Sequence, residues 1–171
     1  VTIFVNFPTA FAKLFKAFSV FIPERTLKKF QILGEQDQEQ LFKFLPPQAV
    51  PEALGGMLSS PIGPMAGPCK TLTVRARGNE EMPLIKIASP CTIQWEVRVC
   101  YWEISYELYF YADGSEPELV KKSEAMVQST DGIVRGEYVA KVPGELKCNF
   151  INNGAWFKSR FCLGRAEEKK S

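Results

Sequence analysis

Apolar and polar side chains alternate strictly along residues 91–110, and the phase of the alternation shifts by one residue midway. The apolar positions before the shift are Ile93, Trp95, Val97 and Val99, and those after it are Trp102, Ile104, Tyr106, Leu108 and Phe110. A period of two is typical of a strand with one buried face, and a strand changes that face only at a bulge or a turn. The pattern therefore predicts two core strands separated by a break at Cys100-Tyr101, with Trp95 and Trp102 in the core.

The remainder of the C-terminal half has the same character. Further alternating runs lie at residues 71–76 and 146–150, and turn signals occur at Asp113-Gly114, Asp131-Gly132 and Pro143-Gly144. Asn152-Asn153-Gly154 predicts a hairpin that leads into a last strand over about Trp156 to Leu163. Several short strands with regular turns and no helical period predict a β-sandwich.

The N-terminal half has α/β character. A strand at residues 1–5 ends before Pro8, and a helix follows whose apolar residues recur at three- and four-residue spacing, with Thr9 as its N-cap and Pro23 as its stop. Residues 24–30 then predict a short basic helix, residues 31–33 a short strand, and residues 37–44 another helix that ends before Pro46-Pro47.

An uncharged stretch rich in proline and glycine, SSPIGPMAGP at residues 59–68, separates the two halves. It predicts a linker between a domain segment at 1–58 and a sandwich at 69–166, with a tail at 167–171. Because Val1 opens directly into a strand-like run, we expect the sequence to be part of a longer protein.

Composition excludes several classes of function. The chain has no histidine, five cysteines without a CxxC pair, and a net charge of +2. Hydrolysis by a catalytic triad and metal binding by Cys/His clusters are therefore not expected, because the histidine and the CxxC pairs that they usually need are absent. Nucleic-acid binding is not expected either, because the sequence has no strongly basic stretch. No carboxylate pair is placed for acid–base work, so we expect no enzyme, no metal and no cofactor. We expect the cysteines to be packed, reduced thiols.

Residues 1–58 resemble a known family through an ordered series of motifs. The series is Val5-Asn6-Phe7-Pro8 with its Phe-rich helix, then Lys28-Lys29-Phe30-Gln31-Ile32-Leu33-Gly34, then the run from Pro46-Pro47 to Gly55-Gly56. It is similar to the C-terminal part of CRAL-TRIO domains, the fold of phosphatidylinositol and phosphatidylcholine transfer proteins. Thr9, Ala10 and Leu54 stand where that family commonly has aromatic residues.

Residues 91–106, with Trp95 and Trp102, are similar to the signature of GOLD domains, although Tyr101 stands where a small residue is common. CRAL-TRIO followed by GOLD is the order found in patellins and related animal proteins. The resemblance implies an α+β chain overall: a partial α/β CRAL-TRIO segment, then an all-β GOLD sandwich.

The resemblance implies a mobile lid over a bound lipid at the Phe-rich helix. The apolar side chains that would form this gate and the pocket wall are Phe11, Leu14, Phe15 and Phe18. The alternative is an ordinary amphipathic helix packed on a sheet.

Lys29 falls at the position where phosphatidylinositol-transfer members of the family contact the inositol phosphate. The alternative is a solvated surface lysine. In the predicted last strand, Trp156, Lys158 and Arg160 would share one face, opposite Phe157 and Phe161, and could meet anionic lipid headgroups. The alternative there is a solvated outer face of the sandwich.

These observations predict a protein that binds phospholipid, phosphoinositides in particular, and transfers it between membranes in the course of membrane trafficking. The expected partners are phospholipid, a membrane surface and a trafficking protein that binds the GOLD domain, with no nucleic acid. We expect a cytoplasmic protein associated peripherally with membranes. The alternative is a non-catalytic adaptor in which the sandwich recruits a trafficking protein.

Overall fold

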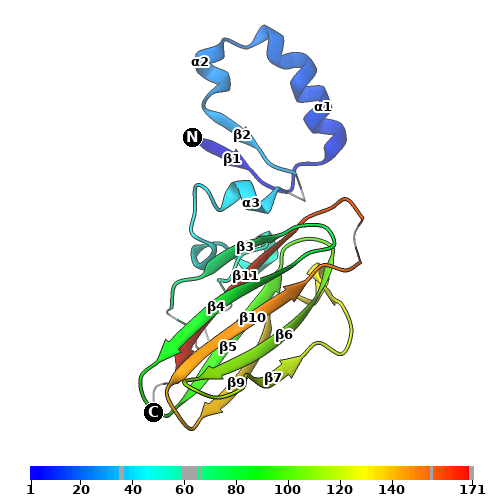
Figure 1. Cartoon of the computed structure of the whole chain (residues 1–171). Helices are drawn as coiled ribbons and strands as arrows, with labels where there is room; N and C mark the ends of the chain where they lie inside the picture. Colours follow the sequence, from blue (N-terminus) through cyan, green and yellow to red (C-terminus); the bar gives the residue numbers. More distant parts are fainter. Residues whose placement is uncertain (35–36, 59–64, 66, 155, 170–171) are drawn as a thin grey trace.

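A computed structural model describes residues 1–34, 37–58, 65, 67–154 and 156–169. A small segment of helices and two short strands stands at one end of a β-sandwich (Figure 1). The predicted order, a partial α/β segment followed by an all-β sandwich, is confirmed. Most of the predicted linker, residues 59–64 and 66, lies outside the described residues.

The N-terminal segment is built around a two-stranded parallel ladder. Strand β1 (Thr2–Phe4) pairs with β2 (Phe30–Ile32), and the connection carries helix α1 (Thr9–Phe18), the 3-10 turn η1 (Ser19–Phe21) and helix α2 (Glu24–Leu27). The predicted cap at Thr9 is wrong: Pro8 holds the N-cap position, and Thr9 is already helical. Proline suits this position because it is extended and has no N–H to satisfy.

Residues 37–58 form short helical turns that pack against the sandwich. They comprise α3 (Gln38–Leu41), η2 (Pro47–Ala49) and η3 (Glu52–Leu54). The chain then doubles back, so that Leu58 donates its N–H to the Val50 carbonyl at 2.9 Å. Gly56 lies so close to the Val50 backbone that no side chain fits there. The helix predicted at residues 37–44 is shorter than expected, because α3 spans only Gln38–Leu41.

The sandwich consists of two antiparallel sheets. One sheet has the order β4-β10-β6-β7, with β8 also paired to β6, and the other has the order β3-β11-β5-β9. The first contains β4 (Asn79–Ile87), β6 (Glu103–Ala112), β7 (Glu118–Lys122), β8 (Val127–Gln128) and β10 (Gly144–Ile151). The second contains β3 (Lys70–Val74), β5 (Cys91–Val99), β9 (Val134–Ala140) and β11 (Arg160–Glu168); the 3-10 turn η4 (Ser129–Asp131) precedes β9.

The predicted break at Cys100-Tyr101 separates β5 in one sheet from β6 in the other. The chain turns at Trp102, whose φ of 62° is left-handed, and the change of sheet explains the shift in phase. Trp95 is 3% exposed in the core, as predicted. The prediction for Trp102 is wrong, because its ring lies half-buried at the turn and outside the core cluster.

Two predictions about the last strand are also wrong. β10 and β11 belong to different sheets, so Asn152-Asn153-Gly154 begins a crossing between sheets and no hairpin. The strand itself begins at Arg160, four residues later than predicted, and continues to Glu168 into the predicted tail.

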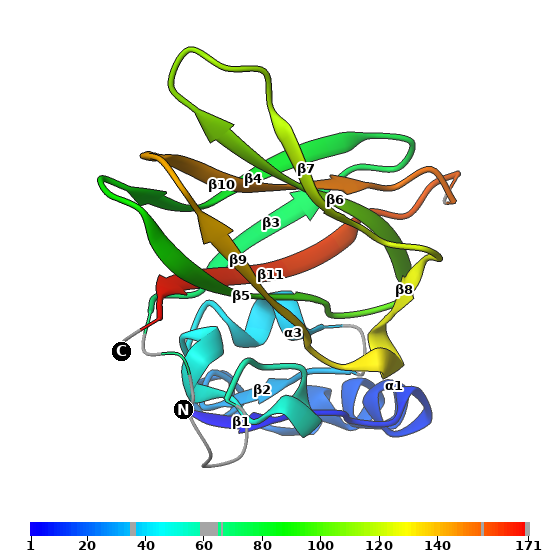
Figure 2. The same cartoon turned by 90° about the horizontal axis from the view of Figure 1, so that it is seen from below.

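Figure 2 shows the sheet β3-β11-β5-β9 as the middle of three layers, between the other sheet and the N-terminal segment. Its outward side chains Cys100, Phe161 and Leu163 pack with Met57 and Phe42 of the N-terminal segment. Strands β5 and β11 are therefore buried on both faces, which is unusual for an antiparallel sandwich. The five cysteines are free thiols, and Cys100, Cys148 and Cys162 are buried.

Candidate functional site

Helix α1 presents an exposed apolar row. Phe11, Leu14 and Phe18 are 58%, 50% and 57% exposed, whereas Phe15 is half-buried. The row continues through Val20 and Phe21, which are 77% and 81% exposed. An ordinary amphipathic helix would bury this face against its own sheet. Here the face is open to a further apolar partner.

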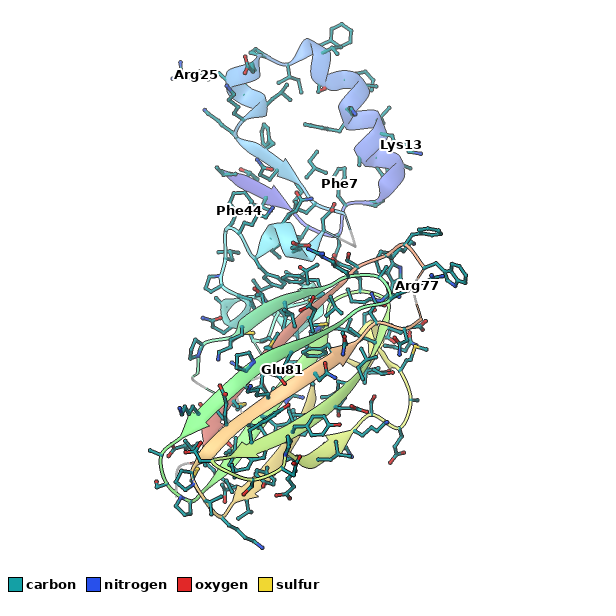
Figure 3. The ribbon with its side chains drawn as sticks, in the orientation of Figure 1. Phe7, Lys13, Arg25, Phe44, Arg77 and Glu81 are labelled. Carbon is teal, nitrogen blue, oxygen red and sulfur yellow. The ribbon has the colours of Figure 1, made fainter. Side chains whose placement is uncertain are left out.

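An aromatic surface connects the ladder with α1. The ring centres of Phe4 and Phe7 are 6.0 Å apart, those of Phe7 and Phe11 are 6.3 Å apart, and those of Phe4 and Phe30 are 6.1 Å apart. Figure 3 shows Phe7 between the strands and the helix, with Lys13 on the far side of α1. The arrangement forms an apolar wall with the charged side chains of the helix outside it.

Lys29 lies immediately before β2, where its carbonyl accepts the Thr2 N–H at 2.7 Å. Its side chain is exposed and has no hydrogen bond or ion pair within the described part of the chain. The neighbouring Lys28 is already bound to Glu24, 2.7 Å away. The ladder therefore fixes the backbone of Lys29 and leaves its ammonium group available to an anion.

The three predicted membrane-surface residues do not share a strand face. Trp156 is 71% exposed and Lys158 is exposed, both ahead of the strand, but Arg160 is 4% exposed. The Arg160 guanidinium lies 4.9 Å from the Trp102 ring centre and donates to the Glu103 carbonyl at 2.7 Å. Lys158 Nζ lies 4.3 Å from the same ring. Sequence reasoning misses this contact because the apolar alternation predicts Trp102 in the core.

A buried ionic network joins the two halves of the chain, and sequence reasoning missed it. Arg165 and Glu96 form an ion pair of 2.7 Å, and Arg165 also donates to the carbonyls of Met57 and Met65. Arg98 donates to the carbonyls of Glu52 and Gly56, both at 2.9 Å. All three charged residues occupy outward strand positions, which alternation alone assigns to solvent.

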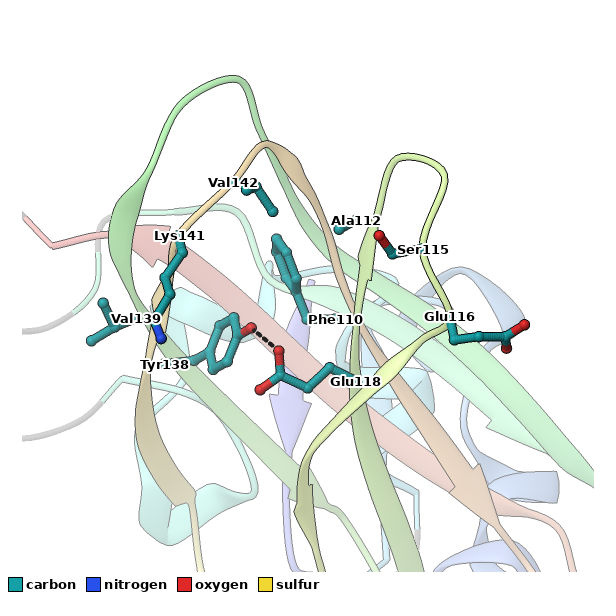
Figure 4. A pocket seen from close by; sticks show the side chains of 9 residues that line it. All are labelled: Phe110, Ala112, Ser115, Glu116, Glu118, Tyr138, Val139, Lys141 and Val142. Carbon is teal, nitrogen blue, oxygen red and sulfur yellow. Dashed lines mark hydrogen bonds between the residues drawn. The ribbon is translucent and has the colours of Figure 1, made fainter.

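A cavity of about 260 Å³ is lined by residues of β6, β7 and β9 and of the connections beside them. Phe110 and Tyr138 form its floor with ring centres 5.1 Å apart, and Tyr138 donates its hydroxyl to Glu118 at 2.8 Å (Figure 4). Burial, together with that hydrogen bond, raises the pKa of Tyr138 to about 12. Lys141 and the exposed Val139 line the rim. The cavity can hold an apolar side chain beside a polar contact.

Comparison with known proteins relates the N-terminal segment to a described domain family and the whole chain to named plant proteins. Residues 1–56 match the CRAL/TRIO domain. Over 99% of its length the chain is 30% identical to Patellin-6 of Arabidopsis thaliana, and over 84% it is 24% identical to Patellin-3 of the same plant. This chain resembles the patellins. The predicted resemblance is thus confirmed, and the antiparallel sandwich is consistent with a GOLD domain.

The patellin likeness covers only part of those relatives, because the chain spans 42% of Patellin-6 and 31% of Patellin-3. Among solved structures, the N-terminal cellulose-binding domain of a Cellulomonas fimi β-1,4-glucanase aligns with 62% of the chain and 86% of its own length, at 12% identity and a TM-score of 0.40. Within the described residues, no helix is both long and apolar enough to span a bilayer.

Proposed function

We propose that this chain is part of a phospholipid carrier that binds phosphoinositides and moves them between membranes in the course of trafficking. The observation that carries the proposal is the apolar row of α1, where Phe11, Leu14 and Phe18 are each at least half exposed. Such a row suits a lid that covers acyl chains in one position and touches a bilayer in another. Half-buried Phe15 would belong to the pocket wall.

Lys29 is the proposed headgroup contact. Its ammonium group is exposed and unpaired within the described residues, while the backbone beneath it is fixed by the Thr2 hydrogen bond. A lysine binds phosphate as a point charge with three donors. The proposed setting is cytoplasmic, with peripheral attachment to membranes.

The test compares Lys29→Ala with Lys28→Ala in the full-length protein. Labelled phosphatidylinositol is moved between donor and acceptor vesicles, with phosphatidylcholine transfer as a reference. Loss of one charge-assisted contact of about 1.5–3 kcal/mol predicts a fall in phosphatidylinositol transfer of about tenfold or more in Lys29→Ala. Lys28→Ala, which removes only an exposed pair, is expected to behave like the wild type. Equal transfer by both variants would remove Lys29 from the mechanism.

The cavity in Figure 4 favours a second candidate function, an adaptor whose sandwich recruits a trafficking protein. A partner side chain would sit on Phe110 and Tyr138, beside the Glu118 carboxylate. The adaptor predicts that the purified full-length protein carries no phospholipid in native mass spectra. The carrier predicts a stoichiometric lipid adduct, so this one spectrum separates the two functions.

A further inference from the structure

The turn between β3 and β4 meets the segment ahead of β11 at one end of the sandwich. The guanidinium carbon of Arg77 lies 3.7 Å from the centre of the Trp156 ring. Trp156 is 71% exposed and its neighbour Phe157 is 91% exposed. These three residues, with Lys158, are called the aromatic tip below. Within the described residues, no apolar side chain covers either ring to the extent that a core would, and an exposed aromatic patch of this kind often marks a binding surface.

A buried asparagine holds the aromatic tip together. The Asn152 side chain is 1% exposed, and its amide donates to the carbonyls of Arg75 and Lys158 at 2.9 and 3.0 Å. Its backbone bonds to the same turn, because Arg77 donates to the Asn152 carbonyl at 3.0 Å. Arg160 adds a second bond to the Lys158 carbonyl at 3.1 Å. The exposed rings therefore project from an anchored frame.

The charge around the aromatic tip is positive. Arg75, Arg77 and Lys158 are all exposed, and none of them forms an ion pair within the described ranges of the chain. Aromatic residues prefer the interface between bilayer and water, and each cation close to an anionic membrane contributes about 1 kcal/mol to binding. An exposed Trp-Phe pair, with Arg77 stacked on the tryptophan and Lys158 next in sequence, is complementary to an anionic bilayer in both respects.

We infer that the aromatic tip docks the sandwich on anionic phospholipid bilayers. Trp156 and Phe157 enter the headgroup region, and Arg77 and Lys158 meet lipid phosphates. Arg160 is a positioning residue in this arrangement, since its guanidinium is held by carbonyls and by the Trp102 ring. The inference concerns membrane contact by the sandwich and does not depend on a lipid cavity in the N-terminal segment.

Trp156 itself provides the readout. The chain is mixed with vesicles of phosphatidylcholine and phosphatidylserine in which a fraction of the acyl chains is brominated, and tryptophan quenching is recorded. Trp95 is buried and Trp102 is covered by Lys158 and Arg160, so the difference between wild type and Trp156→Phe reports on the tip. We expect quenching that is present with these vesicles, absent with phosphatidylcholine alone, and lost in Trp156→Phe.

Vesicle sedimentation supplies the energetics and the matched controls. Removal of each cation is expected to lower the partition coefficient about fivefold, so Arg77→Gln/Lys158→Gln should lower it about 25-fold. Trp156→Ser/Phe157→Ser should lower it at least tenfold. The controls Lys86→Gln on β4 and Leu119→Ser on β7 change exposed side chains outside both the tip and the cavity of Figure 4, and they should bind like the wild type.

Unquenched Trp156 in vesicle-bound protein would overturn the inference, as would folded Arg77→Gln/Lys158→Gln and Trp156→Ser/Phe157→Ser variants that sediment like the wild type. Circular dichroism of each variant shows whether it is folded, and Trp156→Phe, which keeps an exposed aromatic ring, stays informative if the serine variants unfold. The lipid content of the full-length protein is expected to be unchanged in the tip variants. The lipid content therefore tests the carrier function and the vesicle binding tests the membrane contact of the tip, so that each hypothesis can fail without the other.

Discussion

At the residue scale, Glu107 on the outer face of β6 shows how one charged side chain can make stability depend on pH. Its carboxylate binds Lys122 at 2.8 Å and accepts the Tyr109 hydroxyl at 3.0 Å. The hydrogen bond from Lys122, followed by that from Tyr109, lowers the pKa of Glu107. A lowered folded-state pKa means that the ionised form stabilises the fold. That contribution is complete above the ordinary glutamate pKa of about 4.3 and is lost as the pH falls through the lowered value.

Glu107→Gln should therefore flatten the acid limb of the stability profile. The urea midpoint of the wild type is expected to fall between about pH 5 and pH 3, and the variant should lose part of that slope while matching the wild type more closely at low pH. Glu116→Gln is the control, because that carboxylate has no hydrogen bond or ion pair within the described residues. Identical slopes for Glu107→Gln and the wild type would contradict this account.

At the scale of elements, the packing of β5 on β9 depends on a missing side chain. Trp95 pairs in register with Gly136, and a Cβ at Gly136 would overlap the indole ring. The ring also meets Tyr106 of the facing sheet edge-on, with centres 6.3 Å apart. The absence of a side chain at Gly136 thus leaves the room that the Trp95 indole ring occupies in the core.

Gly136→Ala should force the Trp95 ring away from its position and destabilise the fold by about 1–3 kcal/mol, the usual result of overpacking. Urea unfolding and the near-ultraviolet dichroism of tryptophan both report the change. Val139→Ala on the same strand, where the side chain is 62% exposed, should change stability by less than about 0.5 kcal/mol. An unaltered tryptophan signal in Gly136→Ala would show that the ring does not depend on this space.

Local sequence patterns predict single strands and helices more accurately than they predict which other elements pack or pair with them. Alternation in residues 91–110 predicts both strands and the break, because the period of two follows from burial of one face. The cover on the outer face of β5 comes from residues 47–58, far away in sequence, so Glu96 and Arg98 carry no local sign of their burial. Asn152-Asn153-Gly154 fits a hairpin or a crossing between sheets equally well, and only the partners of β11 decide between them. The predicted position of Arg160 depends on that choice, because the predicted hairpin leads directly into the strand that carries it.

At the scale of the whole molecule, buried charged side chains connect the N-terminal segment to the sandwich. Arg165 is 2% exposed and contacts Glu96, the Met57 carbonyl of that segment and the Met65 carbonyl of the predicted linker. Arg135 binds the other Glu96 oxygen at 2.8 Å. Buried ion pairs add little to stability against an apolar replacement, but removal of one partner leaves an uncompensated charge. The network therefore fixes the position of the segment on the sheet.

Arg165→Met should cost about 3 kcal/mol in unfolding free energy, because the Glu96 carboxylate and the carbonyls of Met57 and Met65 lose their donor. Combining Glu96→Gln with Arg165→Met should cost less than the sum of the two single changes, since they share one interaction. A double-mutant cycle from urea unfolding measures this. Strict additivity would show that the pair is not coupled.

The position of β11 between β3 and β5 has a consequence for biosynthesis. Strands β3 and β5 do not pair with each other, so a nascent chain that ends before Arg160 has an open gap in the middle of one sheet. The strand that closes the gap is translated last among those of the sandwich. Folding of the sandwich therefore cannot be completed until residues 160–168 have emerged from the ribosome, and until then the edges of β3 and β5 that face the gap stay unpaired.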